Sequence, residues 1–143
     1  MKKYKAKKGA GFNDDDAQVI GQTIEDLRDS KGHITPIEIV ENAKNKKSPI
    51  HNFFEWEESK AAEQYRLQQA RNLVNHIVEI VVIQGEEIEQ RSFFSVNVEN
   101  NGKVYVTLKD AIENEDYREQ LLNKAITQLE NLTIIMKMFK EYN

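Results

Sequence analysis

The chain has 143 residues, of which 39% are hydrophobic and 31% are charged, and its formal net charge is −4. This composition suits one folded domain with a heavily solvated surface and argues against a disordered chain. The lack of cysteine excludes disulfides, thiol catalysis and cysteine-ligated zinc, and no apolar run approaches the roughly 20 residues that span a bilayer.

The first twelve residues combine lysine, glycine and alanine without an apolar period. Such a segment is typical of a mobile terminus, so we predict a flexible basic arm over residues 1–12. The arm contains five lysines, which are Lys2, Lys3, Lys5, Lys7 and Lys8. Without them the rest of the chain is clearly acidic. An acidic body repels phosphate at long range, so attraction to nucleic acid must come from the arm or from a local patch.

Residues 13–143 are predicted to form a single α+β domain, with a helical part over 13–75. Its helices follow start signals or apolar stripes at helical spacing. The predicted three-helix unit comprises about 14–29, 36–44 and 57–75. The first helix begins beside the capping residue Asn13, and the second begins at Thr35 with Pro36 in its first turn.

The second part of the domain, 76–143, is predicted to hold a small antiparallel three-stranded sheet and a long C-terminal helix. The apolar period changes to two after the third helix, and an Asn-Asn-Gly sequence at 100–102 signals a tight turn. The three strands are predicted over 76–83, 88–98 and 104–108.

The C-terminal helix is predicted from about Asn114 to Glu141, with Asn114 as a cap. Its apolar stripe is formed by Leu121, Leu122, Ala125, Leu129, Leu132, Met136 and Phe139. Such a stripe either covers a sheet or pairs with a second copy in a coiled-coil-like seam. The helix is about 40 Å long, more than a three-stranded sheet can cover, which favours a homodimer.

No catalytic motif is found in the sequence. The three histidines lack the spacing of metal ligands, and there is no P-loop, dinucleotide-binding fingerprint or nucleophile elbow. We therefore expect a protein that is not an enzyme and that uses no cofactor or metal. We expect Phe53, Phe54 and Trp56 to belong to the core, with His51 packed beside Trp56 or bonded to a backbone group.

Three helices followed by a hairpin occur in winged-helix units, which place one helix in the major groove of DNA. Here the third helix carries side chains suited to base or phosphate contacts, and lysines follow the second helix. The predicted nucleic-acid-binding residues are Lys2, Lys3, Lys5, Lys7, Lys8, Lys44, Lys46, Lys47, Arg66, Gln69 and Arg71. Two alternatives stay open: the arm is a solubilising tail, and Arg66 and Arg71 pair with carboxylates on the surface.

Several segments form distinctive sequence motifs. They are Ser48-Pro49-Ile50-His51, Phe54-Glu55-Trp56, Ala61-Ala62 and Tyr65-Arg66-Leu67-Gln68-Gln69-Ala70-Arg71, with Glu115-Asp116-Tyr117-Arg118-Glu119-Gln120-Leu121-Leu122 further on. Together they resemble a family of small uncharacterised proteins encoded by tailed bacteriophages and prophages, over about residues 14–140. The resemblance implies a protein of the host bacterial cytoplasm with an accessory role in phage DNA metabolism or regulation. It implies no catalytic residue.

Two functions follow from these patterns. The first is a non-enzymatic phage accessory protein that binds DNA or a nucleoprotein complex through the lysine-rich arm and a winged-helix-like unit. The alternative is a protein-binding phage module, an inhibitor or adaptor of a host or phage protein, in which the acidic body and the long C-terminal helix carry the interface. Neither involves a membrane.

Overall fold

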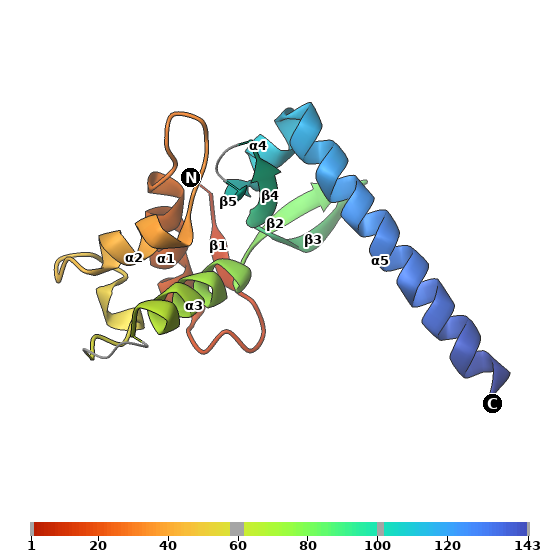
Figure 1. Cartoon of the computed structure of the whole chain (residues 1–143), viewed down its shortest axis with the longest axis horizontal. Helices are drawn as coiled ribbons and strands as arrows, with labels where there is room; N and C mark the ends of the chain where they lie inside the picture. Colours follow the sequence, from red (N-terminus) through yellow and green to blue (C-terminus); the bar gives the residue numbers. More distant parts are fainter. Residues whose placement is uncertain (1, 58–61, 100–101, 143) are drawn as a thin grey trace. The chain divides into compact units, whose positions relative to one another are not determined.

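The computed structural model describes residues 2–57, 62–99 and 102–142, and it combines helices with two small antiparallel sheets (Figure 1). The helices are α1 (Asp14–Asp26), α2 (Pro36–Ala43), the 3-10 helix η1 (His51–Phe53), α3 (Ala62–Asn75), α4 (Leu108–Glu113) and α5 (Glu115–Glu141). The strands are β1 (Tyr4–Ala6), β2 (Ile77–Ile83), β3 (Glu86–Arg91), β4 (Phe93–Val98) and β5 (Gly102–Thr107). The chain divides into two compact units, unit 1 over Met1–Leu108 and unit 2 over Lys109–Asn143, instead of dividing after residue 12.

Three of the predicted helix starts are confirmed by capping hydrogen bonds, whereas the helix predicted from 57 is described only from Ala62, and residues 58–61 lie outside the described residues. The Asn13 side chain accepts from the Asp16 N–H at 2.8 Å, and the Asp16 side chain bonds back to the Asn13 N–H. The Thr35 side chain accepts from the Glu38 N–H in α2, and the Asn114 side chain accepts from the Tyr117 N–H in α5. Each cap satisfies an N–H group that has no partner within the helix, so these short polar residues fix where the helices begin.

The predicted three-stranded sheet is corrected to two sheets, with strand orders β1-β2-β3 and β4-β5. The predicted strand over 88–98 is divided at Ser92 into β3 and β4. The Ser92 N–H donates to Ile77 O of the first sheet, and Ser92 O accepts from Leu108 N beside the second sheet. The chain therefore leaves one sheet and enters the other at this fully buried serine, which periodicity alone does not reveal.

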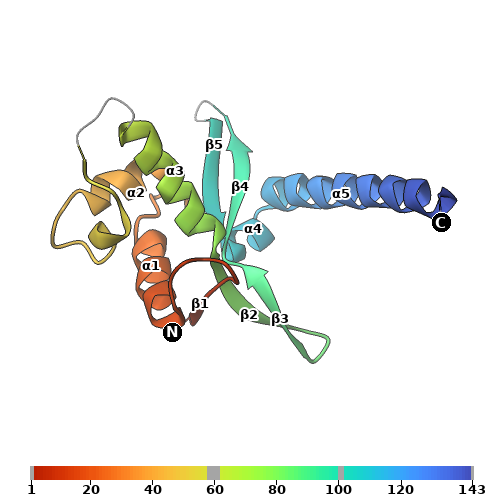
Figure 2. The ribbon, with the colours of Figure 1, turned by 90° about the horizontal axis from the view of Figure 1, so that it is seen from below.

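A two-residue turn closes the β2–β3 hairpin, whose tip extends away from the helices of unit 1 (Figure 2). Gln84 and Gly85 both have positive φ, and Ile83 pairs with Glu86 across the turn. Two successive left-handed residues match the right-handed twist of the strands that they join. The described residues of β4 and β5 also pair antiparallel, and Asn100 and Asn101 of the predicted turn lie outside the described residues.

The predicted flexible arm over residues 1–12 is corrected by β1. Tyr4–Ala6 pairs antiparallel with β2, and Tyr4 is fully buried against α1. The Tyr4 N–H donates to Gln18, and the Ala6 N–H donates to Asp14, both at 2.9 Å. A strand of three residues with one large apolar side chain has too little periodicity to be recognised in the sequence.

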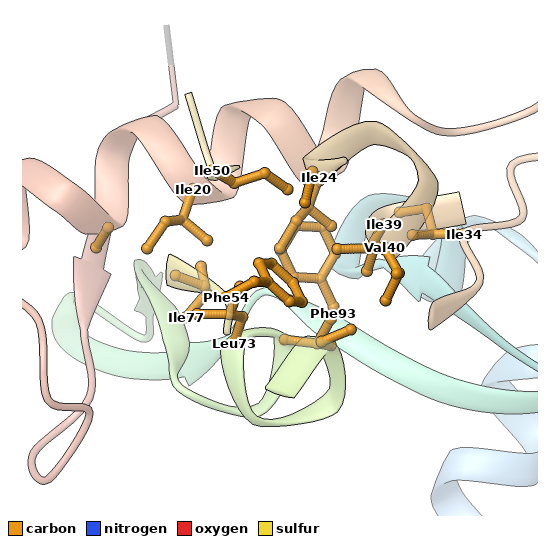
Figure 3. Close-up of a cluster of buried hydrophobic side chains, with 14 of the residues drawn as sticks. Ile20, Ile24, Ile34, Ile39, Val40, Ile50, Phe54, Leu73, Ile77 and Phe93 are labelled. Atoms are coloured by element: carbon orange, nitrogen blue, oxygen red, sulfur yellow. The ribbon is translucent and has the colours of Figure 1, made fainter. Parts of the chain in front are cut away.

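The hydrophobic core of unit 1 joins α1, α2, α3 and the strands (Figure 3). The fully buried side chains include Ile20 and Ile24 of α1, Val40 of α2 and Phe93 of β4. Phe54 is also buried, while Phe53 and Trp56 pack at the edge of the cluster, so the predicted aromatic core is confirmed in this graded form.

Candidate functional site

The five N-terminal lysines form two groups in the structure. Lys2 Nζ lies 2.7 Å from a carboxylate oxygen of Glu25, and Lys5 Nζ lies 3.8 Å from Glu89. The other three are exposed: Lys3, Lys7 and Lys8. Two of the predicted phosphate contacts are therefore paired with the protein's own carboxylates, which weakens their attraction for phosphate.

The Lys2–Glu25 pair belongs to a polar cluster that holds β1 in place. The Tyr4 hydroxyl donates to the same Glu25 oxygen at 2.9 Å. Burial, reinforced by this bond, raises the pKa of Tyr4, so the hydroxyl keeps its proton. Burial also raises the pKa of Glu25, but hydrogen bonds from Lys2 and Tyr4 outweigh it and leave that pKa lowered. Near neutral pH the Tyr4 hydroxyl therefore keeps its proton and the Glu25 carboxylate accepts its hydrogen bond, which secures β1.

Three side chains from η1, the loop after it and α3 stack on one another. The rings of His51 and Trp56 lie 4.9 Å apart between centroids with an interplanar angle of 6°, and the Arg66 guanidinium lies 4.9 Å from the Trp56 ring centroid. We call these three residues the clasp. His51 Nδ1 donates to Ala43 O of α2, and Trp56 Nε1 donates to His51 O. The predicted packing of His51 beside Trp56 is confirmed, and the clasp joins α2, η1 and α3.

Two of the predicted nucleic-acid contacts on α3 bind the protein's own backbone. Arg66 donates to the carbonyl oxygens of Glu55 and Glu57, both at 3.0 Å, and its side chain is only 12% exposed. The Gln69 side-chain oxygen accepts from the Glu55 N–H at 3.1 Å. Arg66 and Gln69 thus bind the backbone of Glu55 and Glu57 and are engaged by the protein's own chain.

The other predicted contacts lie at the surface and are not gathered into one site by any interaction among them. Lys44 forms an ion pair with Glu41 at 2.8 Å, one turn earlier on α2. Lys46, Lys47 and Arg71 are exposed, the first two in the loop after α2 and the third on α3. These three, with the exposed N-terminal lysines, are the cations best placed to meet a polyanion.

Two further features of the described chain bear on ligand binding. A shallow hollow is lined by residues 6–16, at the loop between β1 and α1. The N-terminus of α1 there is closed by its own Asn13 cap and followed by three aspartates, so it disfavours anions. Among the described residues, no three histidine or carboxylate side chains come together as a metal site requires.

The most unusual surface of the described chain is on α5. Every residue from Leu122 to Tyr142 is exposed, and none of the residues of α5 is buried. The large apolar side chains among them are Leu122, Ile126, Leu129, Leu132, Ile134, Ile135, Met136, Met138, Phe139 and Tyr142. A helical apolar surface of this extent usually marks an interaction site, since burying each such side chain is worth about 1.5–3 kcal/mol.

The sequence predicted the main stripe of α5 but missed part of its apolar surface. Ile126 and Ile135 flank the predicted stripe, and Ile134 and Met138 lie on the opposite side of the helix. The signal was available, because six of the eight residues from Leu132 to Phe139 are large and apolar. The last turns of α5 are therefore apolar on several sides.

Comparisons with models of protein families, with curated proteins and with solved structures returned no match. Within the described residues, none of the helices combines the length and the apolar character that crossing a membrane requires.

Proposed function

We propose that this chain is a non-enzymatic protein-binding module, of the inhibitor or adaptor kind, and that α5 is its interface. The observation that carries the proposal is the exposure of α5 from Leu122 to Tyr142 with its large apolar side chains uncovered. A helix with an apolar face is a common recognition element, because it lies in a groove or against another helix with anchors one turn apart. The acidic net charge of the chain favours a protein partner over a polyanion.

The setting of this function is proposed from the block between Ser48 and Arg71, which resembles small phage and prophage proteins. In the structure this block forms the clasp and the segment that Arg66 holds. His51, Trp56 and Arg66 of this block therefore have a structural role within unit 1. The proposed module would act inside a bacterial cell that carries the phage or prophage.

Nucleic-acid binding is the second candidate function, and one observation favours it. Lys7 and Lys8 are exposed on a loop that contains two glycines with positive φ, and Lys46 and Lys47 are exposed on another loop. Mobile exposed lysines can replace condensed counterions along a phosphate backbone. Such binding would be sequence-independent and would weaken steeply between about 50 and 200 mM salt.

A capture experiment tests the leading proposal. Full-length tagged chain is incubated with an extract of infected bacteria, with and without nuclease, and retained proteins are identified by mass spectrometry. The test variant Leu129→Lys/Leu132→Lys places charges in the apolar stripe, and the control Thr127→Lys/Asn131→Lys places the same charges on the far side of α5. We expect the wild type and the control to retain the same partner despite nuclease, and the test variant to lose it. Capture that nuclease abolishes, or that both variants retain, would contradict the proposal.

A further inference from the structure

The apolar stripe of α5 has the spacing of a coiled-coil seam. Leu122, Leu129 and Met136 recur every seven residues, and Ala125, Leu132 and Phe139 follow them at the second apolar position of each heptad. The seam from Leu122 to Phe139 lies within one continuous helix, and its large residues are more than 55% exposed. A seam of this regularity is matched best by another helix with the same repeat.

We propose that α5 of one chain pairs antiparallel with α5 of a second copy, about a two-fold axis that passes between Glu130 and Asn131. This inference rests on the proposed function, whose interface it assigns to a second copy. In this register Leu129 lies opposite Leu132 of the second copy, and the same axis places Leu122 opposite Phe139. The remaining layer sets Ala125 against Met136, a small residue against a long flexible one, so every seam position has a partner.

The distribution of charge along α5 selects the antiparallel orientation. The first turns carry Glu115, Asp116 and Glu119 against one Arg118, whereas the last turns carry Lys137 and Lys140 against one Glu141, so the first end is acidic and the last end is basic. The antiparallel register brings Glu119 beside Lys140 of the second copy, and two-fold symmetry makes this pair twice. The helix dipoles are also opposed in this arrangement.

A parallel pair would lose these advantages. It would bring the acidic first turns of both helices together and set Lys140 against Ile135 of the second copy, while Glu119 would have no basic residue beside it. The seam would still be apolar, so the difference between the two orientations lies mainly in the charges that flank it. The flanking charges are consequently the part of the interface that an experiment can reverse.

The antiparallel arrangement has a consequence for the adaptor. The first residues of the two α5 helices lie at opposite ends of the pair, about 45 Å apart along its axis. Two copies of unit 1 are thus attached at separated points, and a partner that meets both is bound bivalently.

Site-directed crosslinking tests the orientation, because the chain has no cysteine of its own. Leu122→Cys and Phe139→Cys chains are prepared separately, mixed, and treated with a short bismaleimide. We expect a crosslinked pair in the mixture and none with Leu122→Cys alone, since its two copies of residue 122 are about 25 Å apart. Efficient crosslinking of Leu122→Cys alone would show a parallel pair and overturn the proposal. Fluorescence of Trp56, the single tryptophan, checks that unit 1 is folded in each variant.

Mass and charge reversal complete the test. Light scattering on the purified chain should give twice its 16.6 kDa. Glu119→Lys or Lys140→Glu alone should weaken the dimer about 2–5-fold, and the two changes together should restore it, because the ion pair is reversed intact. A monomer at every concentration, or a double variant weaker than either single one, would overturn the pairing. A monomer that still captures a partner from the nuclease-treated extract would overturn the pairing and leave the proposed function standing. A crosslinked dimer without any captured partner would support the pairing and overturn the proposed function.

Discussion

Unit 1 and α5 use the same kinds of residue in opposite ways. In unit 1 many large apolar side chains are buried in one core, although others such as Ile37 and Val82 are exposed, and charged groups such as Lys2, Glu25 and Arg66 bind other parts of the fold. On α5 the apolar side chains are exposed from Leu122 onward. A folded chain gains stability by removing apolar surface from water. Unit 1 buries a hydrophobic core by itself, whereas the apolar surface of α5 stays in contact with water. The difference places the buried core in unit 1, and it is the basis of the proposal that α5 carries recognition.

A pair of identical substitutions should break this comparison or establish it. Phe93 is 0% exposed and Phe139 is 69% exposed. We expect Phe93→Ala to lower the free energy of unfolding of unit 1 by about 3–5 kcal/mol, because it leaves a cavity in the core. Phe139→Ala should change it by less than about 0.5 kcal/mol. Urea unfolding followed by Trp56 fluorescence measures both. Similar losses in the two variants would mean that α5 contributes to the core.

Arg66 sharpens the comparison by separating a structural arginine from a surface one on the same helix. Arg66→Met removes both hydrogen bonds to the carbonyl oxygens of Glu55 and Glu57 and the contact with Trp56, and should cost about 1.5–3 kcal/mol of unfolding free energy. Arg71→Met, on the exposed side of α3, should cost less than about 0.5 kcal/mol. Urea titrations give the free energies, and the emission wavelength of Trp56 should shift only in Arg66→Met. Equal costs would mean that the clasp adds no stability.

The close approach of β1 to α1 tests whether the N-terminal segment belongs to unit 1. A Cβ added at Gly21 would overlap the ring of Tyr4. Gly21→Ala should therefore destabilise unit 1 by about 1–3 kcal/mol through overpacking. In a Tyr4→Ala background the obstacle is gone, and the same substitution should stabilise by up to about 1 kcal/mol, because alanine favours a helix more than glycine does. Thermal unfolding of the four chains gives both values. A loss of the same size in both backgrounds would show that Tyr4 does not occupy this position.

Much of this architecture could be predicted because local signals were strong. Asn13, Thr35 and Asn114 are capping residues in front of apolar periods, and each starts a helix where the sequence placed it. The stripe of α5 was equally readable, since it repeats over many turns. The apolar residues Ile134 and Met138 were not predicted as part of this surface, because a search for one stripe at helical spacing leaves out residues on the opposite face.

The features that could not be predicted depend on contacts between distant parts of the chain. Lys2 and Tyr4 were predicted to belong to a solvated arm. In the structure β1 pairs with β2, and Lys2 binds Glu25 of α1. Arg66 was predicted to contact phosphate, but it donates to the backbone carbonyl oxygens of Glu55 and Glu57. Every residue has such an oxygen, so the sequence does not indicate which of them an arginine will bind. Ser92 divides two sheets through bonds to residues 15 and 16 positions away. In each case the sequence gives the chemistry of the side chain but does not give the group with which it interacts.

The smallest expected effect concerns the charge that secures β1. The pKa of Glu25 is lowered in the folded chain, because hydrogen bonds from Lys2 and Tyr4 outweigh the effect of burial. A carboxyl with a depressed folded pKa contributes stability above its unfolded pKa of about 4.3, and loses that contribution as the pH falls through the folded value. Glu25→Gln should therefore be less stable than the wild type at pH 7, and the difference should shrink below about pH 4.5. Urea unfolding at a series of pH values, read from Trp56 fluorescence, measures it. Asp15→Asn, an exposed change of the same charge in the first turn of α1, serves as the control. If the stability difference between Glu25→Gln and the wild type is the same at pH 3.5 and pH 7, the Lys2–Glu25 pair does not stabilise the first strand.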